Sequence, residues 1–220
     1  MYLVTTNVGA PKLEAWKYPL PQDKDIIKIH RVIIETDAAT PRVIRLKMPP
    51  DDRRSTLCDD ISCDGDGGWT DVEWSADAAR LAFVSTPRDH KSAKLRIADA
   101  ATGDVRDVYE EKVATQYESG QGAANWRFLP ATNEFVWYSE RDDWGHLYLY
   151  DAASGRLKNQ ITKGNFVVTR MVKVDDKNRV IYFEANGREA GRDPYFSHFY
   201  RVGFDGNGLT LLTPEDGNHQ

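Results

Sequence analysis

Short stretches of alternating apolar and polar residues recur along most of this chain, separated by turns rich in Asp, Ala, Ser and Gly. Alternation with a period of two residues predicts β-strands, because successive side chains of a strand point to opposite faces. The clearest copy runs from Trp69 to Tyr109. Four strands joined by polar turns are expected there, at Trp69–Trp74, Arg80–Thr86, Ala93–Ala98 and Val105–Tyr109. This copy therefore predicts a four-stranded antiparallel sheet.

The same order of strands is expected twice more downstream. The second copy is Asn125–Leu129, Glu134–Ser139, His146–Tyr150 and Leu157–Ile161, and the third is Val167–Val174, Arg179–Glu184, Phe196–Val202 and Leu209–Leu212. Upstream, Ile26–Thr36 and Arg42–Met48 match only the last two strands of a further copy.

A recurring hairpin marks the repeat. It occurs at Asp37-Ala38-Ala39-Thr40, Asp99-Ala100-Ala101-Thr102-Gly103 and Asp151-Ala152-Ala153-Ser154-Gly155, and the last two begin 52 positions apart. A fourth, looser copy closes at Phe204-Asp205-Gly206-Asn207-Gly208. A repeat of this length lies in the range of β-propeller blades. We therefore expect an all-β fold, a partial β-propeller with about three complete four-stranded antiparallel blades and a partial first blade.

As domain organisation, we expect residues 1–220 to be a single fragment of a propeller domain. The blade remnant is placed at about 1–50, and the blades at about 68–110, 124–162 and 166–213. A propeller closes a ring of about four to eight blades, so this number is too small for a closed ring. We expect a piece of a longer protein, or a chain that self-associates through exposed blade faces or edges.

Composition narrows the class of partner. The chain has 220 residues, a net charge of -5 and Lys and Arg interspersed with Asp and Glu, which argues against nucleic acid as a partner. No stretch approaches the roughly 20 apolar residues of a membrane span. Cys58 and Cys63 could form a disulfide or remain free thiols, so they leave the cellular compartment open.

The sequence gives little support for a metal site. The acidic group Asp59, Asp60, Asp64 and Asp66 lacks the spacing and terminal Glu of a calcium loop, and a solvated acidic loop is favoured. The histidines show no spacing typical of zinc sites. We expect no metal and no cofactor, and we expect His146 to form hydrogen bonds across blades.

One block of the chain resembles a known family. Trp137-Tyr138-Ser139-Glu140-Arg141-Asp142-Asp143-Trp144-Gly145-His146-Leu147-Tyr148-Leu149-Tyr150-Asp151 is similar to the propeller signature of dipeptidyl peptidase IV-like serine peptidases, within the prolyl oligopeptidase family. Similar stretches extend the resemblance over nearly the whole chain, at Leu13–Pro21, Gly67–Trp74, Gln160–Gly164 and Leu212–Gly217.

The resemblance implies a two-part enzyme, an eight-bladed propeller over an α/β-hydrolase domain that removes N-terminal dipeptides, often after proline. It also favours a periplasmic or secreted protein. The hydrolase nucleophile of such enzymes lies in a Gly-x-Ser-x-Gly turn, and this chain contains no such pentapeptide. We therefore expect no catalytic residue here: the parent protein is a serine peptidase, and this part alone is inactive. The charged Glu140-Arg141-Asp142 stretch is interpreted as structural.

The resemblance also implies a pair of adjacent glutamates that binds the substrate amino group. Glu110 and Glu111 are adjacent, but they follow the outer strand of a blade that is too late in the chain. We place the true pair upstream of Met1 and interpret Glu110 and Glu111 as a solvated strand end.

The remaining substrate-binding candidates are Trp126 and Arg127, in the stretch Gln116–Arg127 that enters the second copy. The resemblance implies an aromatic side chain and an arginine facing the bound peptide at such a blade entry. The alternative is that Trp126 packs between blades and Arg127 pairs with a nearby acid.

Two functions remain open. In the first, the chain is the non-catalytic propeller portion of a dipeptidyl peptidase IV-like exopeptidase, which gates and helps to bind the peptide through the missing hydrolase domain. In the second, it is a propeller-type protein-interaction scaffold without peptidase activity.

Overall fold

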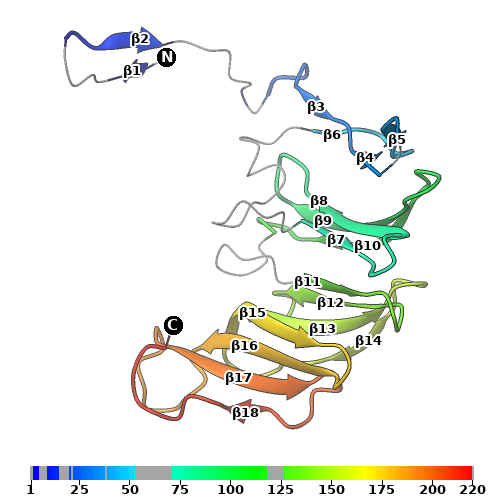
Figure 1. Cartoon of the computed structure of the whole chain (residues 1–220). Helices are drawn as coiled ribbons and strands as arrows, with labels where there is room; N and C mark the ends of the chain where they lie inside the picture. The colour runs from blue at the N-terminus through cyan, green and yellow to red at the C-terminus, as the bar shows by residue number, and fades with distance from the viewer. Residues whose placement is uncertain are drawn as a thin grey trace.

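The computed structural model describes residues 2–4, 9–14, 20, 22–37, 39–52, 71–117 and 126–219. All regular elements in these ranges are β-strands, and three four-stranded antiparallel sheets dominate. Figure 1 shows these sheets stacked one after another in chain order. The expected all-β class, with three complete four-stranded units, is confirmed.

The three sheets are named here by their order. The first sheet contains β7 (Val72–Trp74), β8 (Arg80–Ser85), β9 (Ser92–Asp99) and β10 (Val105–Lys112); the middle sheet contains β11 (Trp126–Leu129), β12 (Glu134–Ser139), β13 (His146–Asp151) and β14 (Leu157–Gln160); the last sheet contains β15 (Val167–Asp175), β16 (Val180–Asn186), β17 (Ser197–Gly203) and β18 (Thr210–Leu211). Each sheet is a meander in which every strand pairs with the next strand along the chain.

Three two-stranded ladders precede the first sheet. They pair β1 (Tyr2–Val4) with β2 (Lys12–Glu14), β3 (Lys28–Ile29) with β6 (Asp51–Asp52), and β4 (Val32–Glu35) with β5 (Arg42–Arg45). The prediction of a single strand over 26–36 is therefore wrong, because β3 and β4 are separated at His30 and Arg31. Arg31 lies outside both ladders, and its guanidinium contacts the carboxylates of Asp51 at 3.2 Å and Asp71 at 3.0 Å.

The cores lie between successive sheets. Strand β12 shows this most clearly, because all six of its residues are buried. Phe135 and Trp137 pack toward the first sheet, and Val136 and Tyr138 pack toward the last sheet. Alternation along β12 is therefore between two apolar interfaces, as expected for sheets that are covered on both faces.

The repeated hairpins contact the preceding unit. In the hairpin after β13, Gly155 has a φ of +68°, and a Cβ atom at this position would lie 2.2 Å from the carbonyl oxygen of Val108. Gly103 occupies the equivalent place in the first sheet, where a Cβ atom would lie 2.5 Å from the carbonyl oxygen of Arg45. Glycine is required at both because the backbone is left-handed and the neighbouring carbonyl is close.

Several expectations concern residues outside the described ranges. They concern Cys58, Cys63, the acidic group Asp59–Asp66 and most of the entry stretch before Trp126. None of the described residues forms a helix long and apolar enough to cross a membrane.

Candidate functional site

Connections between strands gather at two opposite ends of the stacked sheets. In an antiparallel meander the first and third turns share one end, and the middle connection lies at the other. We call the end with the connections 86–91, 140–145 and 187–196 the loop end, and the opposite end the hairpin end. Figure 1 shows both ends, with the hairpin between β13 and β14 at the hairpin end and the C-terminus at the loop end.

Trp126 begins β11 at the loop end. Its side chain is only 6 % exposed and belongs to the apolar cluster between the first and middle sheets. The residue pairs in register with Trp137 of β12. Trp126 therefore packs between two sheets, which matches the alternative weighed for it. Whether it also contacts substrate stays a prediction.

Arg127 forms an ion pair with Glu73 of the first sheet. The two side chains meet at 2.8 Å, and the backbone N–H of Phe128 donates to the same carboxylate at 2.6 Å. Burial raises the pKa of Glu73 from 4.5 to about 7, against the opposing effects of Arg127 and of the Phe128 N–H. The Arg127 side chain remains 45 % exposed, so one side of the guanidinium faces solvent while the other contacts Glu73. Its contact with substrate likewise stays a prediction.

Glu111 is not the solvated strand end that the sequence suggested. It is 7 % exposed, while its neighbour Glu110 is exposed. The Glu111 carboxylate accepts a hydrogen bond of 2.7 Å from the indole N–H of Trp137 and a second bond from the hydroxyl of Ser139. The interpretation of Glu111 was wrong because its partners come from the middle sheet, across the interface.

Arg141 covers this carboxylate from the loop 140–145. Its Nη2 lies 3.3 Å from Glu111 and donates to the hydroxyl of Tyr109 at 2.9 Å, and its Nε donates to Ser139 at 2.8 Å. The guanidinium also stacks over the ring of Tyr148, 4.4 Å from its centroid. The side chain is 33 % exposed. A structural role for the 140–142 stretch agrees with these contacts.

We call Tyr109, Glu111, Trp137, Ser139 and Arg141 the Glu111 cluster. Burial raises the pKa of Tyr109 above its usual range, helped by its hydrogen bond with Tyr150. An arginine held by a carboxylate, a hydroxyl and an aromatic face is pre-organised, and its exposed edge can donate to a carbonyl or carboxylate. Among the described residues no serine hydroxyl contacts a histidine ring, so the cluster has no nucleophile and base of the acyl-transfer kind.

His146 bonds within its own sheet and the segment that follows it. One ring nitrogen lies 3.1 Å from the hydroxyl of Thr162 and the other 2.9 Å from the carbonyl oxygen of Gly164. The expected hydrogen bonds across blades are therefore wrong, and the contact with the next unit is the ring of Phe166, at 5.0 Å between centroids. In the part of the chain that the structure describes, no three His, Cys, Asp or Glu side chains converge on one point.

The fold shows the structural class of the protein. Four-stranded antiparallel meanders, packed face to face in chain order, are blades of a β-propeller. The family model of the dipeptidyl peptidase IV (DPP IV) N-terminal region matches residues 2–220, and the chain belongs to this family.

Relatives and solved structures agree with this assignment. The chain is 35 % identical to dipeptidyl peptidase 4 of Arthroderma otae over 78 residues, which are 36 % of this chain and 9 % of that protein. The crystal structure of Porphyromonas gingivalis dipeptidyl peptidase 4 matches 88 % of this chain and 28 % of that one, with a TM-score of 0.57 and 18 % identity. A putative dipeptidyl aminopeptidase IV from Bacteroides ovatus matches 83 % of this chain and 29 % of that one, with a TM-score of 0.51 and 21 % identity. The chain therefore spans under a third of the length of each of these proteins.

Proposed function

We propose that this chain is the non-catalytic propeller portion of a dipeptidyl peptidase IV-like serine exopeptidase, which removes dipeptides from peptide N-termini, often after proline. The observation that carries the proposal is the family match over residues 2–220. The matched relatives are named dipeptidyl peptidase 4, and each is much longer than the region it shares with this chain. Bond cleavage is assigned to a hydrolase domain outside these 220 residues.

The propeller would contribute selection of the peptide. Rigid stacked sheets that present polar side chains at one end suit this role, because the loops can contact a ligand while the packed interfaces hold them in place. The pre-organised guanidinium of Arg141 offers donors for peptide carbonyl groups at the loop end, and the partly exposed side chain of Arg127 offers further donors. Trp126 would hold the start of β11 in place by packing between the first and middle sheets.

Activity of the full-length parent protein tests the main proposal. A glycyl-prolyl chromogenic amide is expected to be cleaved by the full-length protein and not by the 220-residue chain. Cleavage by neither would favour the scaffold without peptidase activity, and cleavage by the short chain would contradict the placement of the nucleophile.

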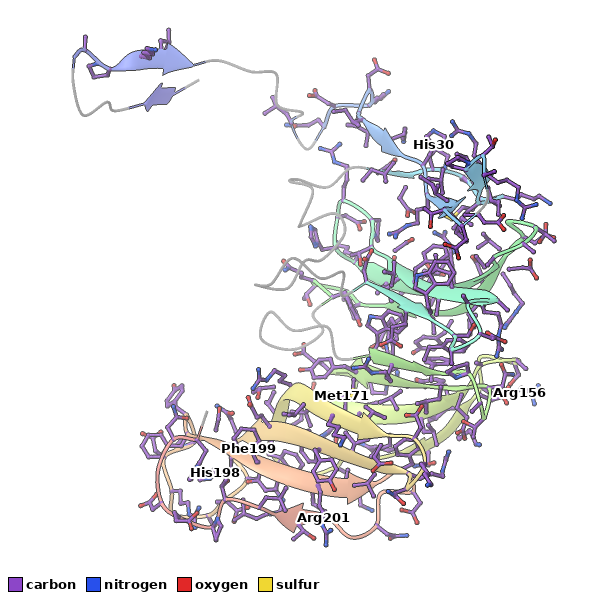
Figure 2. All side chains as sticks on the ribbon, in the orientation of Figure 1. His30, Arg156, Met171, His198, Phe199 and Arg201 are labelled. Atoms are coloured by element: carbon purple, nitrogen blue, oxygen red, sulfur yellow. The ribbon has the colours of Figure 1, made fainter. Side chains whose placement is uncertain are left out.

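The role of Arg127 needs a separate measurement. Arg127→Gln in the full-length protein is expected to raise KM for a hexapeptide substrate and to leave kcat nearly unchanged, because it removes binding that is equal in ground state and transition state. Arg156→Gln is the matched control, since Figure 2 shows Arg156 at the hairpin end. Equal kinetics for the two variants would contradict the substrate contact.

We also propose that the isolated 220-residue chain self-associates, with a second copy as the partner. Strands β4 and β5 pack one face on the first sheet through Ile33 and Ile44. Their opposite face exposes Val32, Ile34 and Val43, which are 40 %, 53 % and 56 % exposed. Sedimentation velocity should show dimers or larger species that Ile34→Glu disrupts, and a concentration-independent monomer would contradict this.

A further inference from the structure

Two histidines meet at the loop end of the last sheet, away from the Glu111 cluster. His198 lies near the start of β17, as Figure 2 shows, and His219 follows the last strand of that sheet. Their ring centroids are 5.3 Å apart with the ring planes inclined by 45°. These rings come from segments about twenty residues apart, so the sequence spacing alone does not point to a ligand site.

His198 is buried, with an exposed fraction of 2 %. Among the residues that the structure describes, neither its Nδ1 nor its Nε2 has a partner within hydrogen-bond distance. A buried polar group in this state is destabilising and unusual, because most such groups are paired with protein or with an ordered ligand. The unpaired ring of His198 therefore favours a ligand-binding role for this residue.

His219 has the hydrogen-bond pattern of a metal ligand. Its Nε2 lies 3.2 Å from the carbonyl oxygen of Glu215, so an N–H at this atom leaves the Nδ1 lone pair free to coordinate. Metal-binding histidines usually donate their second ring N–H to a carbonyl or carboxylate in this way, which fixes the tautomer and the ring orientation.

The separation of the rings also fits a shared ion. With a metal–nitrogen distance of about 2.0 Å and a tetrahedral angle, the centroids of two imidazoles on one zinc ion lie about 5 Å apart. The observed distance of 5.3 Å agrees with this value. His219 is only partly buried, so water can complete the coordination from the solvent side.

The surrounding backbone holds the two rings in place. The backbone N–H of His219 donates to the carbonyl oxygen of Ser197 at 3.0 Å, and the Asn218 side chain accepts from the N–H of Ser197 at 2.8 Å. Upstream, Arg192 donates to the carbonyl oxygens of Pro214 and Glu215. The C-terminal segment is thus fastened beside β17, which pre-organises the pair.

We propose that His198 and His219 form a binding site for a divalent transition-metal ion, of the zinc, nickel or copper type. Imidazole nitrogen suits these ions, and copper is expected to bind most tightly of the three. The site lies apart from the proposed peptide contacts of Arg127 and Arg141, so it does not depend on the proposed function.

The test uses untagged full-length protein stripped with a chelator. Titration with Cu²⁺ alone should show one site, and its electron paramagnetic resonance spectrum should show coupling to two imidazole nitrogens. Zn²⁺ should compete for the same site. His219→Asn should weaken Cu²⁺ binding at least about tenfold and reduce the coupling to one nitrogen. His30→Asn is the matched control, because Figure 2 places His30 far from His198.

Folding of the variants is checked by circular dichroism, and His219 is chosen because it is the less buried of the two. The proposal is overturned if Cu²⁺ binds without nitrogen coupling, if His219→Asn binds as tightly as the unmodified protein, or if no binding occurs below millimolar concentration. In the last case an ordered water beside His198 would explain the unpaired nitrogens.

Discussion

Replacing Glu111 with alanine should destabilise the interface between the first and middle sheets strongly. The change removes the acceptor of the Trp137 indole N–H, which is completely buried, and the counter-charge of Arg141. Breaking a buried charged pair by deleting one partner costs about 3–5 kcal/mol. Because Arg141 is 33 % exposed and water can reach it, we take the lower end, about 3 kcal/mol.

Urea unfolding of the 220-residue chain measures this loss, as a shift in the midpoint at constant slope. The control is Glu110→Ala at the adjacent residue, whose carboxylate is exposed and lies 3.4 Å from Lys112, and it should change stability by no more than about 0.5 kcal/mol. A double-mutant cycle of Glu111→Gln with Trp137→Phe should then give a coupling energy of at least about 1 kcal/mol. Equal effects of the Glu110 and Glu111 alanine variants would refute the reasoning.

Three further predictions concern charge and backbone. Burial raises the pKa of Glu73 from 4.5 to about 7, so the folded state binds more protons than the unfolded state, and the free energy of unfolding should fall as pH rises through this interval. Glu73→Gln should remove this slope from urea midpoints measured between pH 4.5 and 7.5, and an unchanged slope would count against the role of Glu73. Burial opposes ionisation of Glu134, but hydrogen bonds from Arg179 and Lys158 lower its pKa from 4.5 to about 2. The stabilisation from the ionised carboxylate is therefore present above pH 4.5 and should be lost as pH falls toward 2. Glu134→Gln should flatten this loss of stability at acid pH, and an unchanged loss would contradict the assignment. Gly155→Ala should destabilise the protein more than Gly208→Ala, because both glycines have positive φ but only at Gly155 would the new Cβ meet a backbone carbonyl. The melting temperatures of the two variants should differ by several degrees, and equal melting temperatures would disprove the close approach.

Much of the fold could be predicted because its signals are local. Asp99 and Asp151 each accept backbone N–H groups from within their own hairpin, and Gly103 and Gly155 supply the left-handed residue that closes the turn. A turn built in this way needs only four or five consecutive residues, so the repeat is visible in the sequence. The run Phe135-Val136-Trp137-Tyr138 is apolar at every position, which is typical of a strand that is buried on both faces, as β12 is.

The contacts between sheets could be predicted less well. Strand β10 was expected to stop at Tyr109, but it continues to Lys112 and so includes Glu111. Continuing the alternation by two residues would have placed Glu111 on the face of Tyr109, which packs against the middle sheet. That extension is the one local signal for the buried carboxylate, since its partners on the middle sheet lie 26 to 30 positions away.

The partner of Arg127 shows the same limit. An acid near this arginine was foreseen, but nothing local distinguishes Glu73 from the many other carboxylates in the chain. The pairing depends on how two sheets stack, whereas His198 and His219 meet within the last unit, where the C-terminal segment returns beside β17. Burial and charge pairing across sheet interfaces are consequences of tertiary packing, and the candidate sites of this chain depend on them.

The most direct test of the central claim is the product released by the full-length protein from a decapeptide with proline at its second position. Mass spectrometry should show release of the N-terminal dipeptide, and no release when the peptide amino group is acetylated. Cleavage that ignores the acetyl group, or internal cleavage of the peptide, would contradict assignment of this propeller to a dipeptide-releasing exopeptidase.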